Sequence, residues 1–234
     1  MNEKMITVEG LTKEYKTGNV IVPALRGVDL QVHRGEFAAV VGASGCGKST
    51  LLYILGGMLR PTKGSVWIDG FDMIGARDAS RTQFLKQNIG FVFQRFNLIN
   101  SLNVFDNLKI SCKILGAMNG YREKIDEMLC HVGIDHKARM KPLELSQGEQ
   151  QRVAIARALI KEPRILLADE PTGNLDSENS ERIVELFRTM NRGLGQTILM
   201  ITHNRMLADR TDRTFEMKDG RIVSSGTPRQ QDER

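Results

Sequence analysis

Apolar residues form short runs near the start of this chain and recur at helical spacing in its middle. The runs at residues 5–9, 25–32 and 64–69 predict strands. We expect these strands to form a small antiparallel layer. From residue 104 to about 159 the pattern becomes helical, with apolar residues three and four positions apart at Ile125, Met128, Leu129 and Val132.

Strands and helices alternate in the remaining part of the chain. Apolar runs predict strands at residues 89–93, 164–168 and 196–202. We expect Ser177 to cap a helix, because the apolar residues after it fall on one helical face: Ile183, Val184, Leu186, Phe187 and Met190. This alternation predicts an α/β fold with a parallel sheet and a helical insertion near residues 95–160.

The end of the chain carries a hairpin signal. Asp219 and Gly220 predict a tight turn between strands at 214–217 and 221–224. The residues from 227 onward are polar, and we expect them to fray. We find no internal repeat or low-complexity tract, and therefore expect a single domain over residues 1–234.

Length and composition narrow the class of protein. A chain of 234 residues with 41% hydrophobic and 26% charged residues is typical of one globular unit. It has no apolar run of the ~18 residues that a membrane span needs and no signal-peptide core, so we expect a cytoplasmic protein. The net charge of +5 is compatible with nucleic acid or an anionic membrane surface. Acidic and basic residues are interspersed, however, which favours an ordinary solvated surface and no nucleic-acid partner.

The chain has three cysteines, and their spacing is not that of a metal site. Cys112 and Cys130 lie in helical patterns and are expected to be buried. Cys46 lies between two glycines in the loop described next, where backbone amides should make its thiol more nucleophilic. The alternative is an inert small side chain.

The segment GASGCGKST, residues 42–50, follows an apolar run and precedes another. It fits the pattern G-x-x-x-x-G-K-[ST], whose glycines let backbone N–H groups converge on a polyphosphate. Lys48 would contact the β- and γ-phosphates, and Ser49 would bind Mg²⁺. The alternative is a glycine-rich turn that binds nothing. The predicted nucleotide contacts are Gly42, Ser44, Gly45, Cys46, Gly47, Lys48, Ser49 and Thr50.

Three further residues are expected at the ends of predicted strands. Asp169 and Glu170 follow the run 165–168, at the sheet edge where α/β proteins bind ligands. Asp169 would hold Mg²⁺, and Glu170 would polarise an attacking water. His203 follows a strand that should neighbour the one carrying Asp169, and would reach a γ-phosphate; a turn residue is the alternative. Gln94 would contact Mg²⁺ or the water, unless it is an ordinary surface amide.

A second phosphate-handling signal, LSQGEQQR, runs from residue 145 to 152. Together with the first, it makes the chain resemble the ATP-binding subunits of ABC transporters over almost its whole length. The stretch at 145–149 resembles the family signature LSGGQ, residues 171–176 its D-loop, and Gln94 and His203 its Q-loop and switch histidine. The resemblance implies a P-loop NTPase (RecA-like) core and further nucleotide contacts at Tyr15, which would face the adenine, and at Ser146, Gly148 and Asp176.

Several strings resemble the lipoprotein-releasing and macrolide-exporter type of this family: VPALRGVDL, STLLYILGG, FVFQRFNLI and DEPTGNLDS. The resemblance implies a head-to-tail homodimer with ATP and Mg²⁺ at its interface. It also implies a permease with few transmembrane helices, which would hold the dimer on the inner face of the membrane and contact residues 94–102 and the helical insertion. Transport would then be export, lipoprotein release or force transmission.

Two signature positions depart from the family. Gln147 stands where LSGGQ has glycine, and Glu149, where it has glutamine, would bring a negative charge near ATP. Gly148 and Ser146 are retained, and Ser146 is expected to cap the following helix. Two rivals do not fit the chain: a DNA-repair ATPase would need a long coiled coil, for which residues 94–146 leave no room, and a translation ATPase usually has a second cassette. A regulatory cell-division ATPase, which would signal without transport, stays open.

Overall fold

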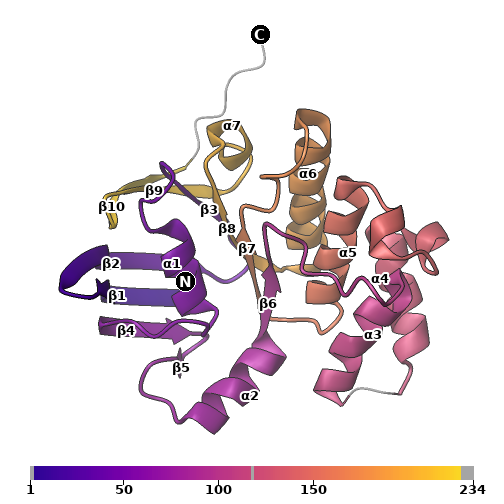
Figure 1. Cartoon of the computed structure of the whole chain (residues 1–234), viewed down its shortest axis with the longest axis horizontal. Helices are drawn as coiled ribbons and strands as arrows, with labels where there is room; N and C mark the ends of the chain where they lie inside the picture. Colours follow the sequence, from indigo (N-terminus) through magenta and orange to yellow (C-terminus); the bar gives the residue numbers. More distant parts are fainter. Residues whose placement is uncertain (1–2, 117–118, 228–234) are drawn as a thin grey trace.

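The computed structural model describes residues 3–116 and 119–227, so most of the segment expected to fray lies outside the described residues. Figure 1 shows an antiparallel sheet beside a larger sheet, with helices packed beyond the larger one. The helices that follow α2 in the chain lie on the side of the larger sheet away from β1 and β2. None of the described helices is long and apolar enough to cross a membrane.

The antiparallel layer is a four-stranded sheet in the order β2-β1-β4-β5. Its strands are β1 (Lys4–Thr17), β2 (Val20–His33), β4 (Lys63–Ile68) and β5 (Phe71–Asp72). The first two are longer than the sequence predicts, because they continue into a hairpin whose side chains at 14–23 are mostly exposed. The outer end of β1 lacks the apolar run from which a strand is recognised. The outer end of β2 has exposed Val20, Ile21 and Val22, but the proline that follows them argues against a strand.

The second sheet has six strands in the order β10-β9-β3-β8-β7-β6. The parallel strands are β3 (Phe37–Val41), β6 (Ile89–Val92), β7 (Ile165–Asp169), β8 (Thr197–Thr202) and β9 (Arg213–Lys218). The last strand, β10 (Arg221–Gly226), returns antiparallel to β9 around the predicted Asp219–Gly220 turn. Alternate β3 residues point into two different cores, as a strand period of two requires.

Seven α-helices complete the described part of the chain: α1 (Lys48–Leu55), α2 (Asp78–Asn88), α3 (Val104–Leu115), α4 (Tyr121–His131), α5 (Gln147–Leu159), α6 (Ser177–Leu194) and α7 (Arg205–Ala208). Short 3₁₀ helices cover Asp135–Lys137 and Pro142–Glu144. The sequence did not predict α2, because it buries no residue and so shows no apolar face.

Two predictions about individual residues are wrong. Cys130 is exposed, because it lies on the solvent side of α4 while Met128 and Leu129 face the core. Asp176 caps α6 in place of Ser177: its carboxylate accepts a hydrogen bond from the backbone N–H of Asn179, and Ser177 is the first helical residue. Cys112 is buried, as predicted.

Candidate functional site

The segment GASGCGKST (residues 42–50), here called the phosphate loop, joins β3 to α1 and forms part of the wall of a cavity of about 340 Å³. Two of its glycines are required by close contacts. A Cβ atom at Gly42 would lie 2.3 Å from the carbonyl oxygen of Met217, and one at Gly47 would lie 2.5 Å from that of Ala24. Gly47 is the N-cap of α1 with a φ of 107°, and no side chain caps this helix. The first N–H groups of α1 therefore face the cavity without an internal side-chain partner.

Lys48 lies over this loop and is buried, with 4% of its side chain exposed. Its Nζ donates hydrogen bonds to the carbonyl oxygens of Gly42, at 2.9 Å, and Ala43, at 3.0 Å. The same Nζ lies 4.0 Å from Oε1 of Glu170. The ammonium group of Lys48 thus lies between the phosphate loop and the carboxylate of Glu170, which follows β7.

Asp169 ends β7 and meets the start of α1. The Oγ of Ser49 donates a hydrogen bond of 3.1 Å to Oδ1 of Asp169, which brings together two of the three residues predicted to contact Mg²⁺. Sequence reasoning missed Tyr53, one helical turn beyond Ser49. Burial, with the Asp169 carboxylate as the second cause, raises the pKa of the Tyr53 phenol to about 12. The i, i+4 spacing of these two residues was the available signal.

Glu170 and His203 face each other across adjacent strands. Strands β7 and β8 pair in parallel with Asp169 opposite Ile201, as the sequence prediction for His203 required. His203 Nδ1 lies 2.9 Å from Oε2 of Glu170. Glu170 has a φ of 41°, in the left-handed region. Such strain in a residue other than glycine persists only where the surroundings fix it, and it is common in active sites.

Gln94 follows β6 and lines the same cavity as Lys48 and Glu170. A Cβ atom at Gly173 would lie 2.8 Å from Nε2 of Gln94, so the glycine leaves room for this amide. The side chain of Asn174 donates a 2.9 Å hydrogen bond to the carbonyl oxygen of Gln94. These roles of Gly173 and Asn174 were not predicted individually, because they depend on a contact eighty residues away in the chain.

The signature stretch starts α5 with a capping box. Ser146 Oγ accepts from the N–H of Glu149 at 3.3 Å, and Glu149 Oε2 accepts from the N–H of Ser146 at 2.9 Å. The other oxygen of Glu149 lies 2.5 Å from Nζ of Lys137. The hydrogen bond from Lys137 is the main cause that lowers the pKa of Glu149. The negative charge expected near ATP is therefore paired within the chain.

The structure brings one group of predicted residues together and leaves another apart from it. The cavity is lined by Ala24, Ser44, Gly45, Gly47, Lys48, Ser49, Thr50, Gln94 and Glu170; only Ala24 was not predicted. Tyr15, Ser146, Gly148 and Asp176 do not line it. Tyr15 is 39% exposed on β1, with Nζ of Lys13 5.3 Å from its ring centre. Asp176 is held by Asn179, whose backbone hydrogen bond is the main cause that lowers the pKa of the carboxyl.

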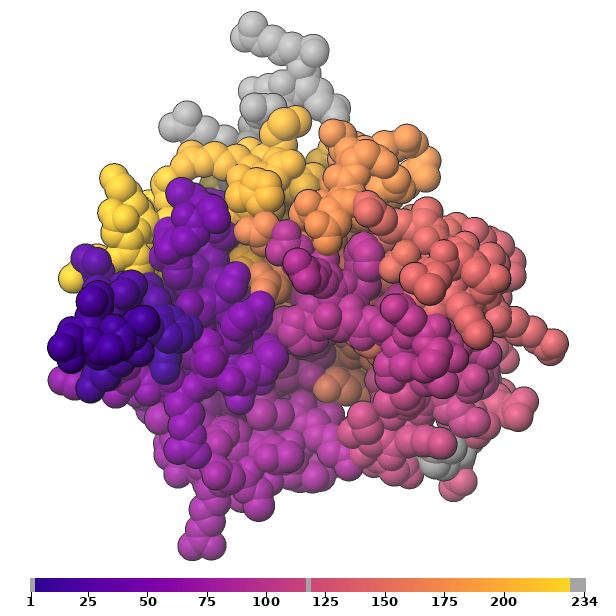
Figure 2. Space-filling model, in the orientation of Figure 1, coloured from indigo at the N-terminus to yellow at the C-terminus, as the bar shows by residue number. Residues whose placement is uncertain are grey.

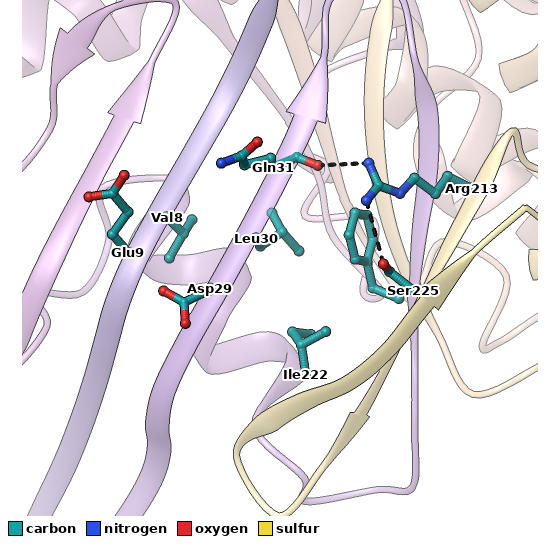
Figure 3. A pocket seen from close by; sticks show the side chains of 9 residues that line it. Val8, Glu9, Asp29, Leu30, Gln31, Arg213, Ile222 and Ser225 are labelled. Atoms are coloured by element: carbon teal, nitrogen blue, oxygen red, sulfur yellow. Dashed lines mark hydrogen bonds between the residues drawn. The ribbon is translucent and has the colours of Figure 1, made fainter.

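A second hollow, of about 430 Å³, lies between β2 and the β9–β10 hairpin (Figure 3). Glu9 and Asp29 lie on one side of it, and the guanidinium of Arg213 lies on the other, bonded to the Gln31 carbonyl and the Ser225 hydroxyl. It contains no glycine loop and no predicted site residue. The features predicted for a polyphosphate site are therefore absent from this hollow and lie at the phosphate loop. On the face shown in Figure 2, the N-terminal third of the chain (indigo to purple) lies on one side and the helical region (magenta to salmon) on the other.

Comparisons with known proteins show the family of this chain. The family pattern described as "ABC transporter" matches residues 25–173. The chain is 44% identical over 221 residues to the lipoprotein-releasing system ATP-binding protein LolD of Geobacter metallireducens, covering 94% of this chain and 98% of that protein. It is 46% identical to LolD of Aquifex aeolicus over 204 residues, or 87% and 91% of the two chains.

A solved structure gives the same result for the fold. The ATP-binding cassette MJ0796, described as a dimer in a post-hydrolysis state bound to ADP and Pi, is 40% identical to this chain. The TM-score is 0.88, and the alignment covers 96% of this chain and 99% of that one. The chain therefore belongs to the ABC transporter family, as one of its ATP-binding, ATP-hydrolysing subunits.

Proposed function

We propose that this protein binds and hydrolyses ATP to power a separate membrane permease, in a transporter of the lipoprotein-release, export or force-transmitting type. The observation that carries the proposal is the convergence of Lys48 and His203 on the carboxylate of Glu170, in the cavity at the phosphate loop. The relatives named for lipoprotein release support the transporter type. The whole chain, residues 1–234, acts as a single ABC ATP-binding domain with a helical subdomain at about 95–160.

The phosphate loop and Lys48 hold the β- and γ-phosphates. Four oxygen-bearing side chains stand close to this position: Ser49, Thr50, Gln94 and Asp169. Hydroxyl, amide and carboxylate oxygens are the ligands that Mg²⁺ prefers, and Ser49 is already bonded to Asp169. Ser49, Asp169 and Gln94 would therefore hold the ion. When bound, Mg²⁺ neutralises charge on the transferred phosphoryl group.

Glu170 supplies the base for hydrolysis. It takes a proton from a water whose oxygen attacks the γ-phosphorus, while the bond from that phosphorus to the β-phosphate oxygen breaks and ADP leaves. His203 fixes the second oxygen of Glu170 at 2.9 Å and so orients the first toward the cavity. The Nζ of Lys48, 4.0 Å from Oε1 of Glu170, lies beside this base in the same cavity.

Four predicted residues lie apart from the cavity and its neighbours: three act at a dimer interface and one at the adenine. Ser146, Gly148 and Asp176 would complete the site of a second copy of the chain, and Tyr15 would cover the adenine. A helix start at Ser146 favours a γ-phosphate over ADP, so that closure senses hydrolysis. The cassette MJ0796 was solved as a dimer, which supports this arrangement. The dimer would bind its permease on the cytoplasmic side of the membrane through residues 94–102 and the helical subdomain.

Glu170→Gln tests this function. The amide keeps the shape and removes the base, so turnover should fall about 10²- to 10⁴-fold while MgATP binding remains. We expect an ATP-bound dimer in gel filtration. The matched control is Glu181→Gln on an exposed position of α6, which should hydrolyse ATP normally. Turnover near that of the parent excludes Glu170 as base, and a monomer that still binds MgATP contradicts the dimer.

A further inference from the structure

The loop between β6 and α3 is held by a side chain from α5. Arg157 donates from Nη1 to the carbonyl oxygen of Asn97 at 2.6 Å and from Nη2 to that of Phe96 at 3.0 Å. Figure 1 shows this loop running from the end of β6 toward α3 and α4, on the side of α5. The two carbonyls are neighbours in the chain, so the fork of one guanidinium fixes the position and orientation of the loop.

This contact is energetically unusual. Arg157 is half-buried, and none of the ion pairs found among residues 3–116 and 119–227 includes it. Burial lowers the pKa of its guanidinium. A partly buried charge without a carboxylate is costly unless its hydrogen bonds hold it. Asn97 has a left-handed φ of 51°, a turn conformation that asparagine tolerates better than most residues.

The rest of the loop is fixed to different parts of the molecule. Fully buried Asn107 on α3 bonds the carbonyl oxygens of Ile99, Leu102 and Asn103. The carbonyl oxygen of Gln94 is instead bonded by Asn174, from the segment between β7 and α6. Between the attachments at residues 94 and 96 only Arg95 intervenes. The loop therefore passes from the strand layer to the helical layer within two residues.

The helix that carries Arg157 is the one that begins at Ser146. Helix α5 runs from Gln147 to Leu159 without interruption, so its N-cap and Arg157 are separated by about 16 Å of rigid helix. The Oγ of Ser111 on α3 also donates to the carbonyl oxygen of Arg157, which ties α3 to the same helix. A displacement of Ser146 must therefore move the loop carbonyls that Arg157 holds.

We propose that Arg157 is a positioning residue that couples the nucleotide-dependent movement of the α5 start to the loop at Phe96 and Asn97, with the chain bending at Arg95. This inference rests on the proposed function, because the movement of α5 comes from ATP-dependent closure. Residues 96–99 then respond to nucleotide although they do not line the cavity at the phosphate loop.

Hydrogen exchange measured by mass spectrometry tests the coupling. The parent is the Glu170→Gln protein, which holds MgATP. Arg157→Met removes both donors and keeps a long apolar stem. The matched control is Arg152→Met, on the same helix, because Arg152 donates to the carbonyl oxygen of Val132 and not to the loop. Each protein is compared with and without MgATP over three segments: 42–50, 96–99 and 147–151.

We expect MgATP to slow exchange in all three segments of the parent and of Arg152→Met. In Arg157→Met, the response at 42–50 and 147–151 should remain and that at 96–99 should be lost. Exchange at 96–99 should also be faster than in the parent by about tenfold or more, since two charged hydrogen bonds are removed. Arg157→Lys keeps the charge but cannot span both carbonyls, so its response should be intermediate.

Two results overturn the coupling: an unchanged response at 96–99 in Arg157→Met, or a parent in which 42–50 and 147–151 respond and 96–99 does not. The second result is measured on the parent alone, so it can refute the coupling even if Arg157→Met misfolds. A parent in which MgATP fails to protect even residues 42–50 overturns the proposed function, and this inference with it.

Discussion

The start of α1 and the start of α5 are both helix N-termini suited to phosphate, and they are built in opposite ways. Helix α1 has a glycine N-cap and no side-chain cap, whereas α5 has the Ser146–Glu149 capping box. Helix α1 carries Lys48 and no acid in its first turn, whereas α5 carries Glu149, paired to Lys137. The backbone N–H groups at the start of α1 are therefore left for an external anion. At the start of α5, side chains of the same chain already accept hydrogen bonds from some of these groups.

This difference indicates an order of events. An uncapped N-terminus with a buried lysine gains most when a polyphosphate arrives, so α1 should bind nucleotide within a single chain. The capped start of α5 offers less, and should contribute only after a partner's nucleotide is brought against it. The following predictions test this contrast, beginning with the largest expected effect.

Ser146→Arg places a bulky cation at the start of α5 and should stop closure. We expect turnover to fall by roughly 10²-fold or more, as when one transition-state contact is removed. Binding of ATP to a single chain should not change, because α1 is intact. Ser80→Arg, at an exposed position of α2, is the control. Normal turnover by Ser146→Arg would show that the signature takes no part.

Mixing Ser146→Arg with Lys48→Ala sharpens the same contrast. A mixed dimer contains one site with an intact phosphate loop and an intact signature, and one site in which both are altered. Turnover should therefore recover to at most half of the parent's value per dimer. No recovery, when mixed dimers are verified by differential tagging, would argue against contributions in trans.

Lys48→Ala removes the one charge fixed over the phosphate loop. Charge-assisted contacts contribute ~1.5–3 kcal/mol, so ATP affinity should fall about ten- to a hundredfold. Calorimetric titration of the purified chain measures this directly. Ser146→Ala serves as the matched change in α5 and should leave single-chain affinity nearly unaltered. Equal losses in the two variants would abolish the distinction between the helix starts.

Glu149→Gln tests the internal pairing of α5. Gln can still accept from the N–H of Ser146 but loses the ion pair with Lys137. Because Glu149 is 28% exposed, the free energy of unfolding at pH 7 should fall by about 1 kcal/mol or less. The lowered pKa of Glu149 means that this stabilisation is present above its unfolded pKa of about 4.3 and is lost as pH falls through the folded value. Urea unfolding should show the difference shrinking in acid; a growing difference contradicts the assignment.

The native thiol of Cys46 can be labelled chemically, so it probes access to the start of α1 without any substitution at that position. The thiol is half-buried, and a Cβ atom added at Gly42 would lie 2.8 Å from its Sγ. We expect a maleimide to label it in nucleotide-free protein and MgATP to protect it. Exposed Cys130 would also react, so the experiment needs a Cys130→Ser background. Burial raises the pKa of the Cys112 thiol, which should react slowly. Labelling of Cys46 that ignores MgATP refutes the idea.

The sequence alone was sufficient to predict the structural features that depend only on residues close together in the chain. The strand–loop–helix at residues 37–55, the carboxylates after β7 and the Ser146 cap are contiguous patterns whose geometry follows from backbone sterics and nearby hydrogen bonds. The same holds for the hairpin at Asp219 and Gly220. Helix α2 and the outer half of β1 escaped prediction, because these exposed elements show no apolar period. The outer half of β2 has apolar residues at 20–22, but Pro23 directly after them argues against a strand.

Contacts between distant segments were decided only by the tertiary structure. His203 at Glu170, Tyr53 near Asp169 and Arg157 at the Phe96 and Asn97 carbonyls join different elements. The exposure of Cys130 depends in the same way on how α4 is rotated against the core. By itself the sequence determined which chemical groups stand at the ends of which strands and helices. Which of them meet was set by the register of β7 on β8 and the packing of α5, which depend on burial summed over the whole core.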